Sequence, residues 1–290
     1  MIDTPYELLN SKTNQAPLPS GGVGGGFFPS GESSDGFFPS GKAGNGLPGG
    51  LLFCTILAAG EQPEHDIPVQ LLQEAPYIVC CDGAIQWCDW ADAVVGDGDS
   101  IPSWARDEYE CIFHQEDDQD DNDLTKATRF CISKGFRKVV YLGATGKRED
   151  HTLGNISLLM RYAREFGIEP LMATNYGWFV PVVGRALSSP SALSSPSALS
   201  SPSALSSPSS PSSPSSPSSP PPLPTRFSSF PGQQVSLFNF SCTHLRTEGL
   251  RYEGYPFQSW WQGTLNEATA ESFTIEADGD YLVYRTYEAK

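Results

Sequence analysis

The sequence predicts an α/β domain, built on a parallel sheet with helices on both faces, followed by a small antiparallel β domain of the sandwich type. Two observations predict this architecture. Residues 51–187 alternate short apolar runs with stretches of helical periodicity, a pattern typical of parallel strands joined by helices. Residues 223–290 contain only short strand-like runs, which is typical of an antiparallel β domain.

The first block contains four runs that we expect to be strands, at 51–58, 77–81, 93–95 and 139–142. Each is short and apolar, as buried strands of a parallel sheet are. Stretches with apolar residues at three-to-four spacing lie around and between them and predict helices at 69–74, 103–109, 124–134 and 153–166. In the second block we expect strands at 235–240, 250–252, 272–275 and 281–284.

Two segments of low complexity divide the chain. Residues 1–50 are rich in Gly and Pro and repeat the sequence FFPSG, so we expect a disordered tail. Residues 188–222 consist almost wholly of Ser, Pro, Ala and Leu, with Pro first at every sixth and then at every third position. Such regular prolines prevent helix and sheet formation and predict an extended linker. The expected domains are therefore 51–187 and 223–290.

Composition excludes several classes of function. The chain has 18 Lys and Arg against 34 Asp and Glu, a net charge of −16, and no basic stripe, so nucleic-acid binding is not expected. No apolar run approaches the length of a membrane span, and the first residues lack a signal-peptide pattern. Seven cysteines without a C-x-x-C pair indicate buried thiols in a reducing compartment. We therefore expect a cytoplasmic protein without a membrane partner.

Carboxylates follow two of the predicted strands directly. Asp82 follows the run 77–81, and residues 96–100 (GDGDS), with Asp97 and Asp99, follow the run 93–95. Ligands of open α/β sheets bind beyond the carboxyl ends of the strands. Two carboxylates in an Asp-x-Asp pattern suit Mg²⁺ bridging to phosphates. The alternative is a polar turn that caps the next helix through Asp99 or Ser100.

Two further segments stand immediately before predicted helices. Residues 116–123 hold six acids in eight positions and are followed by Lys126, which could meet a phosphate; residues 142–151 (LGATGKREDH) follow a strand. Glycines in the second segment let backbone N–H groups approach an anion, and Arg148 can bind phosphate oxygens in a bidentate manner. Alone, the first is by default a solvated acidic loop, and the second is a weak motif whose alternative is a glycine turn capped by Asp150. Together with the strand-end carboxylates they indicate a metal-nucleotide site.

These segments resemble the thiamine pyrophosphokinase family. The resemblance rests on 81–84 (CDGA), 96–100, 119–127 (QDDNDLTKA), 142–146 (LGATG) with the residues at 148, 150, 151 and 155, and 263–267 (GTLNE). It covers about 51–187 and 227–290, in order. Gly98, Lys147 and Leu265 stand where many family members have other residues. The two low-complexity segments have no counterpart in the family.

The resemblance implies transfer of pyrophosphate from ATP to the hydroxyl of thiamine, which gives thiamine diphosphate and AMP. It implies an ATP-binding catalytic domain at 51–187, a thiamine-binding domain at 223–290 and a homodimer. Mg²⁺ and the positioning of the nucleophile fall to Asp97, Asp99 and Asp123. The ATP-binding residues would be Asp82, Gln119, Asp120, Lys126, Thr145, Arg148 and Asp150.

Thiamine is a cation with two flat rings, so an aromatic platform suits it. The candidates are Trp260 and Trp261, beside Thr264 and Asn266. The alternative for the tryptophan pair is packing in the core or at a dimer interface.

Two other functions remain open from the sequence. The first is a thiamine or nucleotide sensor that binds without turnover and uses the Ser/Pro segment to dock a partner. The second is a phosphatase with Asp97 as covalent nucleophile and Asp99 as acid, which requires an aspartyl-phosphate intermediate.

Overall fold

The computed structural model describes residues 1, 3–10, 53–101, 107–116, 120–184 and 224–289. The chain divides into two compact units, Met1–Trp178 and Phe179–Lys290. The second low-complexity segment, and the first beyond residue 10, lie outside the described residues. No helix in the described ranges is long and apolar enough to cross a membrane.

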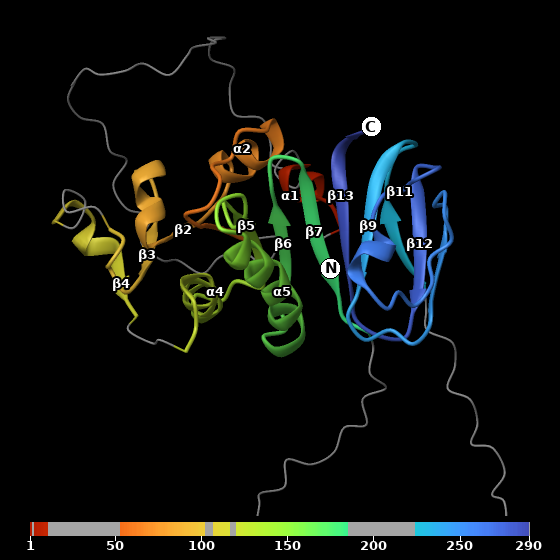
Figure 1. Ribbon diagram of the computed structural model, residues 1–290. Coiled ribbons are helices and arrows are strands. Elements are labelled where there is room, and N and C mark those ends of the chain that lie inside the picture. The colour runs from red at the N-terminus through yellow and green to blue at the C-terminus, as the bar shows by residue number, and fades with distance from the viewer. Residues whose placement is uncertain (2, 11–52, 102–106, 117–119, 185–223, 290) are drawn as a thin grey trace, which may run out of the picture. The chain divides into compact units, whose positions relative to one another are not determined.

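The first unit is built on a parallel sheet with the strand order β6-β5-β1-β2-β3-β4 (Figure 1). Each pair of neighbours runs parallel. The strands are β1 (Phe53–Leu57), β2 (Ile78–Cys81), β3 (Ala93–Gly96), β4 (Phe113–Gln115), β5 (Lys138–Leu142) and β6 (Glu169–Ala173). Strands β1, β2 and β3 are buried along their whole length, which explains their continuous apolar sequences.

Helices connect these strands as the periodicity predicts. They are α2 (Asp66–Gln73), α4 (Asp123–Ser133) and α5 (Glu149–Glu165), with short 3₁₀ turns η1 (Asp82–Trp87) and η2 (Glu110–Ile112). Helix α4 packs on β1, β2 and β3, and α5 packs on β6. Of the helix expected at 103–109, residues 102–106 are outside the described ranges and residues 107–109 are helical.

The sequence did not predict β4 or β6. Pro170 stands within β6, and a proline removes a ladder donor, so such a run reads as a poor strand. In the structure, β6 pairs with β5 from Lys138–Glu169 to Tyr141–Met172. Strand β4 has only three residues, none of them buried, and so carries little apolar pattern.

The first ten residues differ from the tail expected over 1–50. Residues Pro5–Asn10 form helix α1, and the side chain of Leu8 is only 1% exposed. The indole Nε1 of Trp178 donates to the carbonyl of Asp3 (3.2 Å), and Tyr6 meets the same ring edge to face. Unlike the Gly-rich residues that follow, this short segment has apolar side chains that can be buried.

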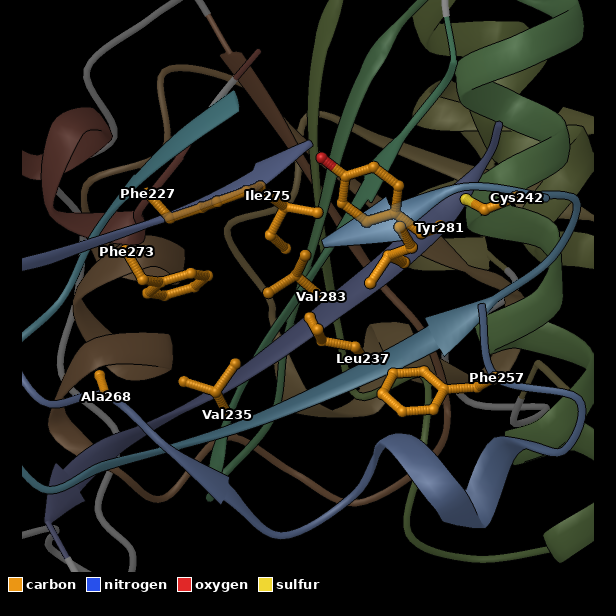
Figure 2. Packing of buried hydrophobic residues seen from close by; sticks show 11 residues of the cluster. Phe227, Val235, Leu237, Cys242, Phe257, Ala268, Phe273, Ile275, Tyr281 and Val283 are labelled. Atoms are coloured by element: carbon orange, nitrogen blue, oxygen red, sulfur yellow. The ribbon is translucent and has the colours of Figure 1, made fainter. Parts of the chain in front are cut away.

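The second unit is a β-sandwich, as expected. Its antiparallel strands are β8 (Thr225–Ser228), β9 (Gln233–Asn239), β10 (Leu245–Glu248), β11 (Asn266–Glu267), β12 (Ser272–Ala277) and β13 (Tyr281–Ala289). One sheet of this unit contains the neighbouring strands β11-β9-β13, and the other has the order β10-β12-β8. Figure 2 shows the core that both sheets share, with Leu237 and Val283 from the first sheet and Phe273 and Ile275 from the second.

The prediction of a strand at 250–252 is wrong. Strand β10 covers Leu245–Glu248 instead, and Leu250 forms only an isolated bridge with Ala268. Gly249 has φ of 83°, a conformation that glycine adopts readily and that ends the strand. The other three expected strands of this block correspond to β9, β12 and β13.

The boundary between the units falls at 178/179, before the low-complexity segment. It lies inside β7 (Gly177–Val182). The ring of Phe179 packs on Phe238 and Tyr284 of the β-sandwich unit. The sequence-based domain limits, 51–187 and 223–290, differ from this division because the apolar run of β7 stands on the N-terminal side of the Ser/Pro segment.

Candidate functional site

A cavity of about 340 Å³ lies in the first unit, where the loops after β1, β2 and β5 meet the start of α4. This is the place at which ligands bind in open α/β sheets. Its lining consists of small residues and a few charged or polar side chains. They are Ala58, Ala59, Gly60, Cys81, Asp82, Gly83, Ser100, Asn122, Asp123, Leu124, Gly143, Ala144, Thr145, Lys147, Arg148, His151, Thr152 and Asn155.

Asp82 is the most deeply buried carboxylate of the cavity, with 2% exposure. Its Oδ2 accepts the backbone N–H of Ser100 (2.8 Å), whereas Oδ1 is buried and has no protein donor in the described part of the chain. Burial raises the pKa of Asp82, and the charges of Asp123 and Asp97 raise it further. Two neighbouring carboxylates therefore act on the buried Asp82, and a cation beside it would relieve both effects.

Asp97 and Asp99 follow β3 and form a tight turn. Oδ1 of Asp97 accepts the backbone N–H of Asp99 (3.1 Å), and Gly98 between them has φ of 84°. Asp97 is half-buried and Asp99 is exposed. Neither belongs to the lining of the cavity. The turn thus brings Asp97 to the electrostatic neighbourhood of Asp82 and leaves Asp99 facing solvent.

Asp123 is the first residue of α4 and lines the cavity. The preceding Asn122 caps the helix, since its side-chain oxygen accepts the N–H of Thr125 (3.0 Å). Lys126 is only 5% exposed and pairs with Asp123 (Nζ to Oδ1, 3.2 Å). This pair places one cation beside the carboxylate cluster and holds it there.

The loop between β5 and α5 approaches the loop after β1 closely. The N–H groups of Gly60 and Glu61 donate to the carbonyls of Gly143 (2.6 Å) and Thr145 (2.7 Å). A Cβ at Gly60 would overlap the carbonyl of Gly143, so this contact requires glycine. The predicted Thr145 lines the cavity at this point.

Arg148 also lines the cavity and forms a bidentate ion pair with Asp150 (Nε to Oδ1, 3.1 Å; Nη2 to Oδ2, 2.6 Å). Both side chains are exposed. The hydrogen bonds from Arg148 lower the pKa of Asp150. Of the other predicted ATP-binding residues, Asp120 is exposed and outside the lining, and Gln119 lies outside the described residues.

The predicted thiamine-binding residues belong to the second unit and form one turn. Trp260 and Trp261 open the 3₁₀ turn η3 (Trp260–Gly263). The ring of Trp260 contacts Phe238 and Phe240, whereas Trp261 is 75% exposed. Trp260 is thus held by its neighbours, and Trp261 presents its ring to solvent.

Asn266 has a structural role in this turn. Its amide bonds both backbone groups of Tyr252 (3.0 and 2.7 Å) and leaves the side chain 6% exposed. The hydroxyl of Thr264 donates to the carbonyl of Trp261 (2.7 Å). A Cβ at Gly263 would overlap the carbonyl of Leu237, so a glycine is required where the turn crosses β9.

The sequence analysis assigned no site role to several residues of the cavity, above all 58–60, Lys147 and Asn155, although Asn155 is among the residues that carry the family resemblance. The signal for 58–60 was their position after a buried strand, but they are small and uncharged. Asn155 donates to the carbonyl of Ala144 (2.8 Å) and accepts from Asn122 (3.0 Å). It is the seventh residue of α5, where a pattern of strand ends gives no indication of it.

The donor set of the cavity suits Mg²⁺, which prefers carboxylate oxygens and retained waters. The buried Oδ1 of Asp82 without a protein donor is the observation that favours a cation here. Among the described residues, no group of three His, Cys, Asp or Glu side chains is arranged to hold a metal by itself. A bound ion would therefore take some of its ligands from substrate or water.

The sequence matches two models of the thiamin pyrophosphokinase family. The catalytic-domain model matches residues 69–169, and the substrate-binding-domain model matches residues 221–284. The first match contains every charged residue that lines the cavity. The second contains the turn with Trp260 and Trp261.

A curated relative is thiamin pyrophosphokinase 1 of Caenorhabditis elegans, with 30% identity over 105 residues. That match covers 32% of this chain and 43% of the relative, and thus less than half of its length. Solved structures with the same fold include thiamine pyrophosphokinase from Bacillus subtilis (TM-score 0.57, 18% identity, 81% of this chain and 98% of that one). Yeast thiamin pyrophosphokinase is similar to the same degree (TM-score 0.59, 13% identity, 82% and 87%).

Both domain models match in chain order, the catalytic-domain model within the first compact unit and the substrate-binding-domain model within the second. The solved structures share that fold over four fifths of the chain. The protein belongs to the thiamin pyrophosphokinase family.

Proposed function

We propose that this protein transfers the pyrophosphoryl group of ATP to the hydroxyl of thiamine, with thiamine diphosphate and AMP as products. The observation that carries the proposal is the coincidence of the cavity with the family's catalytic domain. All of the lining except residues 58–60 falls within the matched residues 69–169. ATP is therefore assigned to the first unit and thiamine to the second.

In the cavity and beside it, carboxylates and cations have separable tasks. Asp82, Asp97 and Asp123 would supply only part of the ligand shell of Mg²⁺, with the rest from substrate or water, and the ion would neutralise charge on the triphosphate when it is bound. Lys126 and Arg148 supply positive charge for phosphate oxygens, and Arg148 must exchange Asp150 for the nucleotide to do so. Asp99, exposed beside Asp97, is free to orient the attacking hydroxyl or accept its proton.

For the acceptor, Trp261 offers the exposed aromatic face that a cationic ring prefers. Trp260 is packed against two phenylalanines and supports the turn. We further propose that the protein acts as a homodimer in the cytoplasm. Seven free cysteines, six of them buried, suit a reducing compartment.

The direct test measures AMP and thiamine diphosphate formed by purified protein from ATP, thiamine and Mg²⁺. We expect equal amounts of the two products, and loss of at least about 100-fold in rate for Asp97→Asn and Asp99→Asn. The exposed Asp89→Asn, outside the cavity, is the matched control and should keep the wild-type rate. Chromatography with light scattering on the same sample tests the dimer.

Other outcomes would contradict the proposal in distinguishable ways. Saturable thiamine binding without product would favour a sensor. Release of inorganic phosphate with a phosphorylated Asp97, independent of thiamine, would favour a phosphatase. Undiminished product formation by Asp99→Asn would remove that residue from the proposed site while leaving the reaction in place.

A further inference from the structure

A lysine at the rim of the cavity contacts two of the loops around it. Lys147 belongs to the loop between β5 and α5, and its Nζ donates to the carbonyl of Ala59 (2.8 Å), after β1. The same ammonium lies 4.4 Å from the ring centroid of Trp87, at the end of η1. One side chain therefore joins the loops that follow β1, β2 and β5.

Lys147 differs from the nearby cations in what balances its charge. Arg148 is paired with Asp150, and Lys126 with Asp123. Within the described part of the chain, no carboxylate forms an ion pair with Lys147, whose partners are a carbonyl and an aromatic face. An ammonium has three N–H donors, and the carbonyl of Ala59 accepts one of them. The side chain thus keeps N–H donors, and a positive charge that no carboxylate among the described residues balances, for an anion in the cavity.

We propose that Lys147 binds the polyphosphate of the ligand that occupies this cavity. Its ammonium exchanges the ring of Trp87 for phosphate oxygens when the ligand enters. The identification of that anion as the triphosphate of ATP rests on the proposed function. The exchange is favourable because an exposed cation gains little from an aromatic ring, whereas hydrogen bonds between ammonium and phosphate are charge-assisted.

The test is calorimetric binding to the full chain with Mg²⁺ and without thiamine, so that no turnover occurs. The probes are ATP, inorganic tripolyphosphate and adenosine. We expect Lys147→Gln to raise the Kd of ATP and of tripolyphosphate about tenfold and to leave that of adenosine unchanged. Lys147→Arg, which keeps the charge, should recover most of the affinity for both anions.

Lys134→Gln is the matched control. Lys134 also holds its ammonium over an aromatic ring, 5.0 Å from the centroid of Phe130, but at the far end of α4 and outside the cavity. The Lys134→Gln variant should bind all three probes with the same Kd as the wild type. Loss of ATP affinity in Lys134→Gln equal to that in Lys147→Gln would show a general charge effect and overturn the inference.

The outcomes separate this inference from the proposed reaction. If Lys147→Gln binds ATP and tripolyphosphate as tightly as the wild type, the inference about Lys147 is overturned, even where the protein forms thiamine diphosphate. An equal loss of adenosine affinity would reduce Lys147 to a structural role and overturn it as well. Lysine-dependent binding of both anions by a protein that makes no thiamine diphosphate would support it and contradict the proposed reaction.

Discussion

Asp82 lies in the cavity in surroundings that disfavour its negative charge. It is buried beside other carboxylates, and its φ of 35° is unusual for a residue other than glycine. Asn tolerates this backbone conformation and keeps an oxygen that can accept the N–H of Ser100. The conservative variant Asp82→Asn therefore removes the charge with little change of shape.

We predict that Asp82→Asn resists urea better than the wild type at pH 7 and loses Mg²⁺-dependent turnover. Burial raises the pKa of Asp82 above its value in the unfolded chain. The folded state therefore binds more protons, and wild-type stability falls as the pH rises through the native pKa. Urea unfolding from pH 3 to pH 7 checks this: the advantage of the variant should vanish toward pH 3.

Asp89→Asn, an exposed carboxylate outside the cavity, is the control for a general effect of net charge. A urea midpoint of Asp82→Asn below that of the wild type at pH 7 would contradict the prediction. Such a result would mean that the hydrogen bonds from Ser100 stabilise the charged carboxylate of Asp82 more than burial destabilises it.

Among the elements, helices α4 and α5 are connected through two amides at the floor of the cavity. Asn122, the cap of α4, donates to Asn155 of α5, which donates in turn to the carbonyl of Ala144. Asn155 is 9% exposed. The chain of hydrogen bonds fixes the start of α4, where Asp123 stands, relative to the loop that carries Thr145 and Arg148.

We predict that Asn155→Ala lowers the free energy of unfolding by about 2 kcal/mol, because it leaves buried partners without a hydrogen bond. It should also raise the Kd of ATP about tenfold, because the two ligand-binding elements lose their connection. Asn175→Ala is the control: Asn175 bonds the backbone of residues 62, 64 and 65 but lies outside the cavity. It should reduce stability and spare ATP binding, whereas equal effects on ATP would contradict the prediction.

The elements that sequence predicts well are those whose burial matches a simple pattern. Strands β1, β2 and β5 and helices α4 and α5 were found because apolar runs and helical periodicity mark them. Strand β6 was missed because Pro170 argues against a strand, and the pairing with β5 outweighs that local preference. Strand β10 was misplaced because Gly249, which ends it, was not recognised as a stop.

The place of the cavity was predicted in part for a similar reason. Asp82, Asp123, Thr145 and Arg148 each stand at a strand end or near the start of a helix and line the same cavity, and their binding of ATP stays a prediction. Lys147 and Asn155 depend on side-chain directions in three dimensions, which spacing along the chain does not give. Strand ends therefore reveal where a cavity lies, and packing decides which side chains enter it.

On the scale of the whole molecule, the low-complexity segment 188–222 interrupts one unit. Strand β7 ends at Val182 and β8 begins at Thr225, and residues 179–290 form a single compact unit. In sequence, the Ser/Pro segment therefore stands between two strands of the β-sandwich unit rather than at the boundary between units. Its sequence has no apolar pattern that would contribute to a core.

We predict that deletion of residues 188–222, with the ends joined by about eight Gly and Ser residues, keeps the rate of thiamine diphosphate formation within about twofold. Shortening the connection between β7 and β8 from about forty to about fifteen residues lowers the entropic cost of bringing its ends together. This raises the free energy of unfolding by about 1 kcal/mol. Urea unfolding and the product assay check the two parts.

A variant with 35 Gly and Ser residues in place of the segment separates the effect of composition from the effect of length. If both variants fold and only the Ser/Pro chain is active, the segment contributes directly to the reaction, because length and core packing would be matched and only its own residues would differ.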